Sequence, residues 1–328
     1  MSFNKFILQE QYKKVSGLGD RLKLMKEQFD WNPFIPIIRS VFHDNLIIGG
    51  RPHTDEIIVV RTMLLQAWYN LSDEDLEFQC HDRLSFRNFL GFPENIPDFS
   101  TLWKIRERLR NSPAEERIWD EVQRQLNKKG YKIKKGVIQD ATFIEADLGR
   151  KRHYKEKKAE KNGETIEYTE QQKSHMDNEG SFSIKHGQVH YGYKNHTKID
   201  VDYDLIRSYK VTTASLHDSQ IDLIKKGDIA AYRDKGYAGA NIATGNVLDK
   251  TMKKATKNKK LNGGEQLYNK AISRIRAPGE RQYAVIKRIF HGGRTFVKRL
   301  GRVSIKEMFK CMAFNVYQLV TLKKRGLA

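Results

Sequence analysis

Three acidic residues lie in settings where a carboxylate could do chemistry. Asp140 falls in an apolar, strand-like segment that begins at Val137. Asp234 follows a short apolar segment at residues 229–232, and Glu280 lies in a helix-like segment near the C-terminus. Carboxylates on two strands and a helix can form a cluster that binds hard divalent cations through oxygen. Two such cations can activate a nucleophile and stabilise the leaving oxygen in phosphodiester chemistry.

Each acid also has a purely structural interpretation. Asp140 could form a hydrogen bond at the end of a strand, and Asp234, before Lys235-Gly236, could be a turn residue. Glu280 could be an acid favoured by the dipole at the start of a helix. Taken singly, the structural interpretation is favoured for each. Their order and contexts taken together favour a common site.

The segment around Glu280 contains one acid among several bases. Pro278 is compatible with the first turn of a helix, so the sequence predicts a helix from Gly279 onward. On that helix Glu280, Tyr283 and Lys287 share a face, because positions three, four and seven apart stack. The alternative is an ordinary surface helix with charged residues seven apart.

The whole chain of 328 residues has a formal charge of +20 and a pI of about 9.7. So much positive charge favours a polyanionic partner, first nucleic acid and second a membrane surface. The chain lacks an apolar run near 18 residues and a signal-peptide pattern, so no membrane partner is expected. Cys80 and Cys311 are expected to be reduced core residues of a cytosolic protein. His190 and His196 lack a third partner, which argues against zinc.

The periodicity predicts an α+β fold with two domains. Residues 1–130 are expected to form a helical N-terminal domain that binds DNA ends, and residues 131–328 a catalytic domain built on a mixed β-sheet flanked by helices. An antiparallel trio of strands is expected. A polar, lysine-rich stretch at about 150–187 is expected to be a long flexible loop. The remaining predicted elements are strands at 137–146, 189–199, 205–213 and 229–232, and helices at 54–69, 101–110, 113–129, 218–226 and 308–322.

Several motifs resemble those of the DDE transposases of prokaryotic insertion sequences, most closely the insertion sequence five family. Asp140-Ala141-Thr142 resembles the first catalytic motif, and Asp234-Lys235-Gly236-Tyr237 the second. Arg276, Glu280 and Lys287 fit the third signature in their spacing. The signature has a tyrosine where this chain has Ser273. Further similar segments are 68–73, 83–89, 96–103, 191–194, 211–214, 217–219 and 313–315.

The resemblance implies a ribonuclease-H-like catalytic domain. Its catalytic residues would be Asp140, Asp234 and Glu280. These three carboxylates would hold two Mg²⁺ ions, or Mn²⁺ in their place. Water would cut the phosphodiester at the element end, and the freed 3′-OH would attack target DNA. Lys235 and Tyr237 are expected to contact DNA. Arg276 and Lys287 would contact DNA near the cleaved end, or would instead orient the carboxylates.

The expected function is therefore a transposase that cleaves double-stranded DNA at insertion-sequence ends and transfers the strands into target DNA. The alternative is a catalytically inactive, transposase-derived DNA-binding protein, and a host nuclease of ribonuclease-H type is a third possibility. Joining two ends implies a homodimer or a higher oligomer during the reaction. The expected location is the cytoplasm of a prokaryote, in association with the nucleoid.

Overall fold

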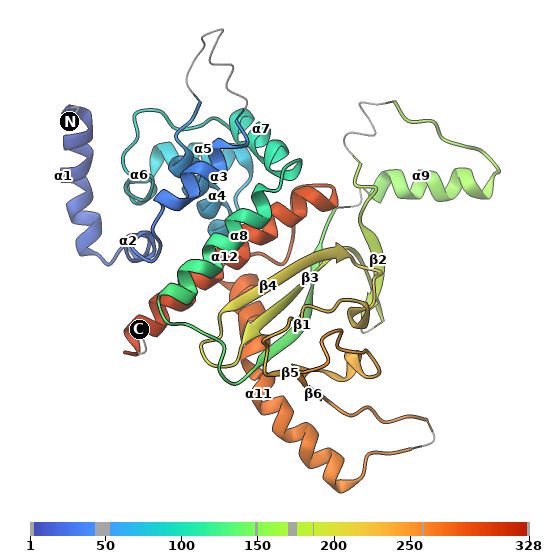
Figure 1. Cartoon of the computed structure of the whole chain (residues 1–328). Helices are drawn as coiled ribbons and strands as arrows, with labels where there is room; N and C mark the ends of the chain where they lie inside the picture. The colour runs from blue at the N-terminus through green and yellow to red at the C-terminus, as the bar shows by residue number, and fades with distance from the viewer. Residues whose placement is uncertain are drawn as a thin grey trace.

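A computed structural model describes residues 3–42, 53–147, 150–169, 176–185, 187–257 and 259–326. The N-terminal half is helical, a mixed sheet follows, and the last helix returns between the two (Figure 1). No helix in the described residues is long and apolar enough to span a membrane. The predicted α+β class is confirmed.

The N-terminal helices begin at polar capping residues. Asp55, Ser72 and Asp98 each accept a hydrogen bond from a backbone N–H of the helix that follows, which satisfies groups that the helix itself leaves free. Thr54 and Ser100, which are also of capping residue types, lie close by but are not the caps. The helices are α1 (Phe3–Gly17), α2 (Arg21–Lys26), α3 (Ile35–Arg39), α4 (Glu56–Tyr69), α5 (Asp73–Asp82), α6 (Leu84–Leu90), α7 (Phe99–Arg110) and α8 (Ala114–Lys128), with the 3₁₀ turn η1 (Asn32–Phe34).

The sheet is built around β1 (Val137–Glu145). β1 pairs antiparallel with β3 (Gln188–Asp200), and β3 pairs antiparallel with β4 (Ile206–Thr213), so the predicted trio is confirmed. On its other edge β1 runs parallel to β5 (Ala230–Arg233), which runs parallel to β6 (Leu248–Thr251). An antiparallel trio extended by two parallel strands is the predicted ribonuclease-H-like arrangement.

Three local predictions were wrong. The stretch at 150–187 contains the helix α9 (Arg150–Lys161) and the strand β2 (Ser181–Lys185), which pairs with the start of β3. Residues 170–175 and 186 of the same stretch fall outside the described part of the chain. The expected helix at 218–226 is only the 3₁₀ turn η2 (Asp218–Gln220). The helix expected from Gly279 is α11 (Gly263–Arg288), which continues through Pro278.

Helix α12 (Leu300–Lys324) joins the helical part to the sheet. It packs on α4 and α7 on one side and on β4 on the other (Figure 1). The prediction that 308–322 packs against the sheet is confirmed, although the helix is longer. Met308, Met312 and Phe314 belong to the same apolar core as Ile138 of β1 and Ile199 of β3. The strand that carries Asp140 is therefore supported by a core shared with the N-terminal helices.

Candidate active site

Asp140 lies near the middle of β1. The backbone of β1 is fixed on one edge by its full ladder with β3, from Val137 opposite Asp200 to Glu145 opposite Gly192. Gly136 precedes the strand with φ +127°, and a Cβ there would lie 2.5 Å from the carbonyl oxygen of Ala230. Only glycine permits this backbone conformation and this close approach to β5.

The register of β1 and β5 brings Asp234 to the same edge as Asp140. Ile138 lies opposite Tyr232 in the parallel pair, so each aspartate follows its paired neighbour by two residues. Asp234 caps the 3₁₀ turn η3 (Lys235–Tyr237), and its Oδ1 accepts a hydrogen bond from the Gly236 N–H at 2.8 Å. The turn interpretation of Asp234 is thus correct, and it leaves the second carboxylate oxygen available.

The electrostatic environment links Asp140 to other acids. The pKa of Asp140 is raised to about 6, chiefly because burial disfavours the charged form. The charges of Asp234 and Asp218 raise this pKa further, while the Arg276 guanidinium and the Ala141 N–H lower it. Asp218 belongs to the segment 217–219, for which the sequence favoured a loop cap over a supporting role at the site, yet its charge acts on Asp140. It lies in the turn after β4 and accepts a hydrogen bond from the Lys194 ammonium at 2.9 Å.

Helix α11 crosses β1 directly over Asp140. Gly279 allows the close approach, because a Cβ there would lie 2.9 Å from Ile138 Cγ2. One turn earlier, Arg276 is 7% exposed and its Nη2 lies 3.4 Å from Asp140 Oδ2. One turn later, the Tyr283 hydroxyl donates to the Asp140 carbonyl oxygen at 2.8 Å. The helix therefore holds both the side chain and the backbone of Asp140.

Glu280 follows Gly279 on α11 but is exposed to solvent. Within the described residues, no three side chains of Asp, Glu, His or Cys converge closely enough to hold a metal ion. The structure thus brings Asp140 and Asp234 to one edge, and it leaves the Glu280 carboxylate on the neighbouring exposed position of the helix. Position 280 lies between Arg276 and Tyr283 in the chain, both of which contact Asp140.

The donor chemistry of this edge suits a hard divalent cation. Carboxylate oxygens are the ligands that Mg²⁺ and Mn²⁺ prefer. The pKa of Asp140 is raised chiefly by burial and further by the charges of Asp234 and Asp218, and a bound cation would relieve this cost of holding an ionised carboxylate there. Arg276 supplies only part of that compensation, at 3.4 Å from the carboxylate. The residues present therefore fit a divalent metal.

The predicted DNA-contacting residues occupy different environments. Lys235 and Lys287 are exposed. Tyr237 is 1% exposed, and the charges of Asp218, Asp140 and Asp234 add to burial in raising its pKa. Arg276 is also buried. In this conformation only the two lysines present their side chains to a partner.

Lys287 lines a cavity of about 440 Å³ beyond the end of β1. His291 and Arg294 line the same cavity, and so does His190, whose Nδ1 lies 3.3 Å from Glu145 Oε1. The loop at residues 291–294 is held in place by the buried Lys310, whose ammonium donates a hydrogen bond to the Gly292 carbonyl at 3.0 Å. Lys287 and Arg294 add positive charge to this cavity, beyond the end of the strand that carries Asp140.

The histidines considered as zinc ligands have other partners. His196 is fully buried, its Nε2 lies 2.9 Å from Thr212 Oγ1, and burial lowers its pKa to about 4. His217, which was not a zinc candidate, caps the turn at Asp218–Gln220 through its Nδ1, which accepts a hydrogen bond from the Ser219 N–H.

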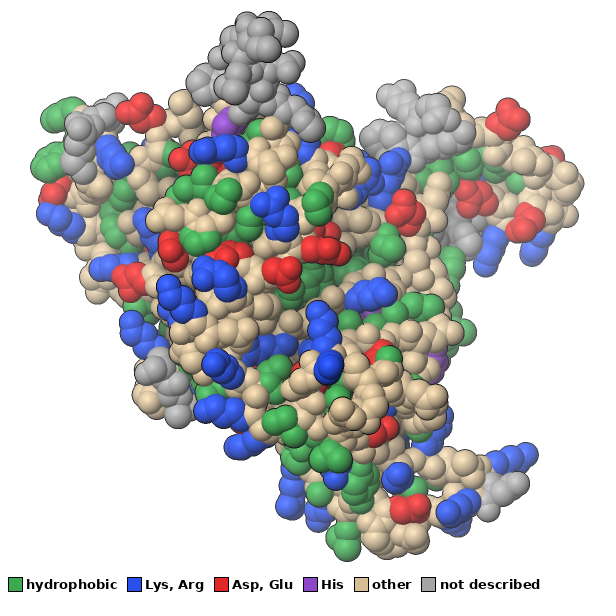
Figure 2. All heavy atoms as spheres, viewed as in Figure 1, with side chains coloured by type: hydrophobic (Ala, Val, Ile, Leu, Met, Phe, Trp, Pro, Cys, Tyr) green, Lys and Arg blue, Asp and Glu red, His purple; other side chains and the backbone are tan. Residues whose placement is uncertain are grey.

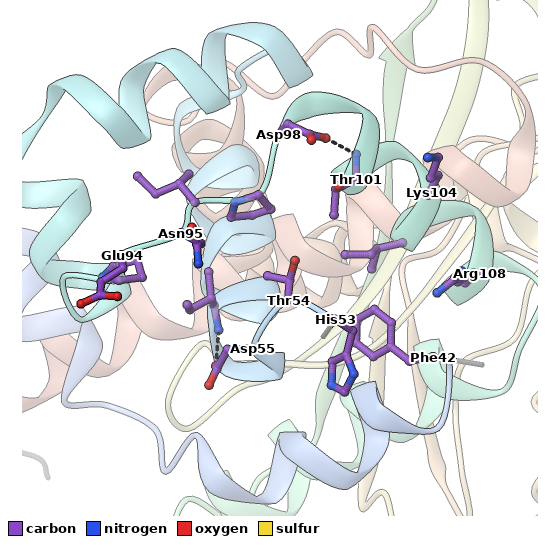
Figure 3. Close-up of a pocket in the computed structure, with 15 residues that line it drawn as sticks. Phe42, His53, Thr54, Asp55, Glu94, Asn95, Asp98, Thr101, Lys104 and Arg108 are labelled. Carbon is purple, nitrogen blue, oxygen red and sulfur yellow. Dashed lines mark hydrogen bonds between the residues drawn. The ribbon is translucent and has the colours of Figure 1, made fainter. Parts of the chain in front are cut away.

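A cavity of about 630 Å³ lies among the N-terminal helices (Figure 3). Asp55 and Asp98, two of its acids, are already used as helix caps. Lys104 and Arg108 of α7 lie at the right of the view. None of the three predicted catalytic acids lines this cavity, so it is separate from the site on the sheet.

Two family models match the chain. The family model of the transposase domain DUF772 matches residues 9–108, and that of the transposase DDE domain matches residues 131–316. A search of solved structures gave no match. The second family model covers more than half of the chain and includes Asp140, Asp234 and Glu280. Both matches indicate a function in DNA transposition, which implies DNA binding. The chain belongs to the family of transposases with a DDE domain.

Proposed function

We propose that this transposase cleaves double-stranded DNA at the ends of an insertion sequence and joins them to target DNA in a metal-dependent reaction. The observation that carries the proposal is the pair formed by Asp140 and Asp234 at neighbouring strands, with a raised pKa at Asp140. A pKa shifted by burial and by neighbouring carboxylates is typical of functional sites. The formal charge of +20 supports DNA as the substrate.

The three acids have distinct parts in this proposal. Asp140 and Asp234 hold the cation with carboxylates that the sheet fixes, and Glu280 adds its carboxylate when its side chain turns toward Asp140. Divalent ions bound there would activate the attacking oxygen and stabilise the leaving oxygen. The exposed position of Glu280 leaves its side chain free to reorient. Closure of the site would then accompany the binding of metal and DNA.

Arg276 and Tyr283 are positioning residues. The buried guanidinium of Arg276 contacts the Asp140 carboxylate, which supports the orienting role over direct contact with DNA. Tyr283 fixes the backbone of β1 through its hydroxyl. Lys235 and Lys287, both exposed, are proposed to contact DNA phosphates on either side of the acids. Two ends must be joined in one complex, so we propose a homodimer or a higher oligomer during the reaction.

The test is cleavage of labelled DNA that carries the sequences flanking the gene, measured with Mg²⁺ and with Mn²⁺. Wild-type protein should cut at the element ends, and Asp140→Asn and Asp234→Asn should bind the same DNA without cutting it. The second candidate function is a DNA-binding protein that has lost its chemistry. It is favoured by one observation, the outward position of Glu280, and it would be supported if wild type binds both ends but never cuts.

A further inference from the structure

Residues 250–274, here called the basic arm, project from the edge of the sheet. The arm comprises the end of β6, the loop that follows it, and the first half of α11 (Figure 1). The segment contains eight basic residues and one acid, Glu265. The basic residues are Lys250, Lys253, Lys254, Lys257, Lys259, Lys260, Lys270 and Arg274. Figure 2 shows lysine and arginine side chains gathered over the tip of this projection.

These cations are presented to solvent. All but Lys250, which is half-buried, are exposed. The acid next to the arm in the sequence, Asp249, forms an ion pair with Arg233 at 3.1 Å. Within the arm, the single carboxylate of Glu265 stands against eight basic residues. The arm therefore carries a concentrated positive charge.

The arm is also held in a defined conformation. The side chain of Asn269, 6% exposed, accepts a hydrogen bond from the Lys253 N–H at 2.8 Å and donates to the Lys253 carbonyl at 2.9 Å. Thr256 and Lys259 exchange backbone hydrogen bonds of 3.0 and 3.2 Å, and Asn262 forms a capping box with Glu265. Charges on an ordered scaffold lose less conformational entropy on binding than charges on a mobile tail.

We propose that the basic arm binds the phosphate backbone of duplex DNA without regard to sequence, as a contact separate from the acids of the sheet. Clustered lysines repel one another, and binding to a polyanion relieves that repulsion with release of counterions. The arm is continuous with the site because α11 also carries Arg276, which contacts Asp140. DNA held on the arm is thereby directed toward the edge of the sheet where Asp140 and Asp234 lie.

The test compares wild type with a variant that carries Lys254→Gln, Lys257→Gln, Lys259→Gln and Lys260→Gln. The dissociation constant for a duplex of unrelated sequence is measured over a range of salt concentrations, with a chelator present so that no cleavage occurs. Each lost phosphate contact reduces the salt slope by about 0.9. We expect the slope to fall by about 2–4 and the affinity to fall at least about 10-fold.

The matched control removes the same charge elsewhere, through Lys128→Gln, Lys129→Gln, Lys132→Gln and Lys134→Gln near the end of α8. These lysines are also exposed. The proposal is overturned if the control loses as much affinity as the arm variant, or if the arm variant binds as wild type does. A duplex carrying the element ends should show the same loss as unrelated DNA, and a loss confined to the ends would overturn sequence-independent binding. The measurement needs neither metal nor cleavage, so it stands apart from the proposed reaction.

Discussion

Replacing Asp140 by asparagine should make the metal-free protein more stable at neutral pH. The pKa of Asp140 rises from its ordinary value of 3.8 to about 6 in the folded protein, so folding disfavours the ionised carboxylate. Each pKa unit corresponds to about 1.4 kcal/mol, which gives at most about 3 kcal/mol for a shift of roughly two units. The Asp140 side chain is 19% exposed, and solvent screening reduces the expected gain to about 1–3 kcal/mol.

The pH dependence of this effect has a definite sign. An acid whose pKa is raised by folding costs no stability below its unfolded pKa, and the cost develops between pH 3.8 and about 6. Asparagine does not ionise, so Asp140→Asn should match wild type near pH 4 and exceed it at pH 7.5. Adding Mg²⁺ should stabilise wild type and leave the variant unchanged, because only the carboxylate attracts the cation strongly.

The assay is urea unfolding in the presence of a chelator at both pH values, followed by the same experiment with Mg²⁺. Asp82→Asn, at an exposed position at the end of α5, is the matched control and should change the free energy of unfolding by less than about 0.5 kcal/mol. A variant at Asp140 that is less stable than wild type at pH 7.5, or a difference that does not vary with pH, would refute the reasoning.

Three further predictions concern α11 and α12. Gly279→Ala should lower the free energy of unfolding by about 1–3 kcal/mol, because the added Cβ would lie 2.9 Å from Ile138 Cγ2. The control Gly263→Ala, at the open start of the same helix, should leave this free energy unchanged or raise it. Tyr283→Phe removes the hydroxyl that holds the Asp140 backbone, so it should lower the free energy of unfolding by about 1–2 kcal/mol. The variant should also cleave DNA more slowly while binding it with nearly unchanged affinity. Unchanged cleavage would contradict the positioning role. Burial lowers the pKa of Lys306 to about 7. Between pH 7 and 10 the unfolded chain therefore binds more protons than the folded one, and the free energy of unfolding of wild type should rise relative to Lys306→Met by up to about 1.4 kcal/mol per pH unit. Parallel curves of unfolding free energy against pH for the two proteins would exclude this.

Strands β1, β3, β4 and β5 were predictable because their residues alternate or run apolar between clear turns, whereas β2 and β6 were not predicted. Asp140 and Asp234 were grouped by their order and contexts and by the resemblance to DDE transposases. The parallel pairing of β1 with β5, which brings both to one edge of the sheet, was not predicted. The helix predicted at 218–226 does not form, because the segment makes a tertiary contact that its local sequence pattern does not reveal. The buried Gln139 side chain bonds the Ile221 carbonyl and the Leu223 N–H, which holds that segment against β1.

In α9 and α11, one feature of the sequence led to a wrong prediction of local structure, because helix propensity or tertiary packing outweighed it. α9 lacks an apolar face, and we took this as evidence for a loop, but lysine, glutamate and alanine are good helix formers. Pro278 suggested a helix start, yet α11 continues through it. A proline inside a helix removes one hydrogen bond, and the packing of Ile272, Gly279 and Ile286 against the rest of the molecule outweighs that loss.

The central claim is that Glu280 joins Asp140 and Asp234 in holding the metal, and a metal-exchange experiment tests it most directly. End cleavage is measured for Glu280→Cys with Mg²⁺ and with Mn²⁺, beside Glu160→Cys at an exposed position on α9. Both native cysteines are buried, so each variant adds one accessible thiol. The account predicts that Glu280→Cys loses cleavage with Mg²⁺, recovers part of it with Mn²⁺, which accepts sulfur ligands more readily, and still binds DNA, while Glu160→Cys cuts as wild type does. Full cleavage by Glu280→Cys with Mg²⁺ would contradict the claim.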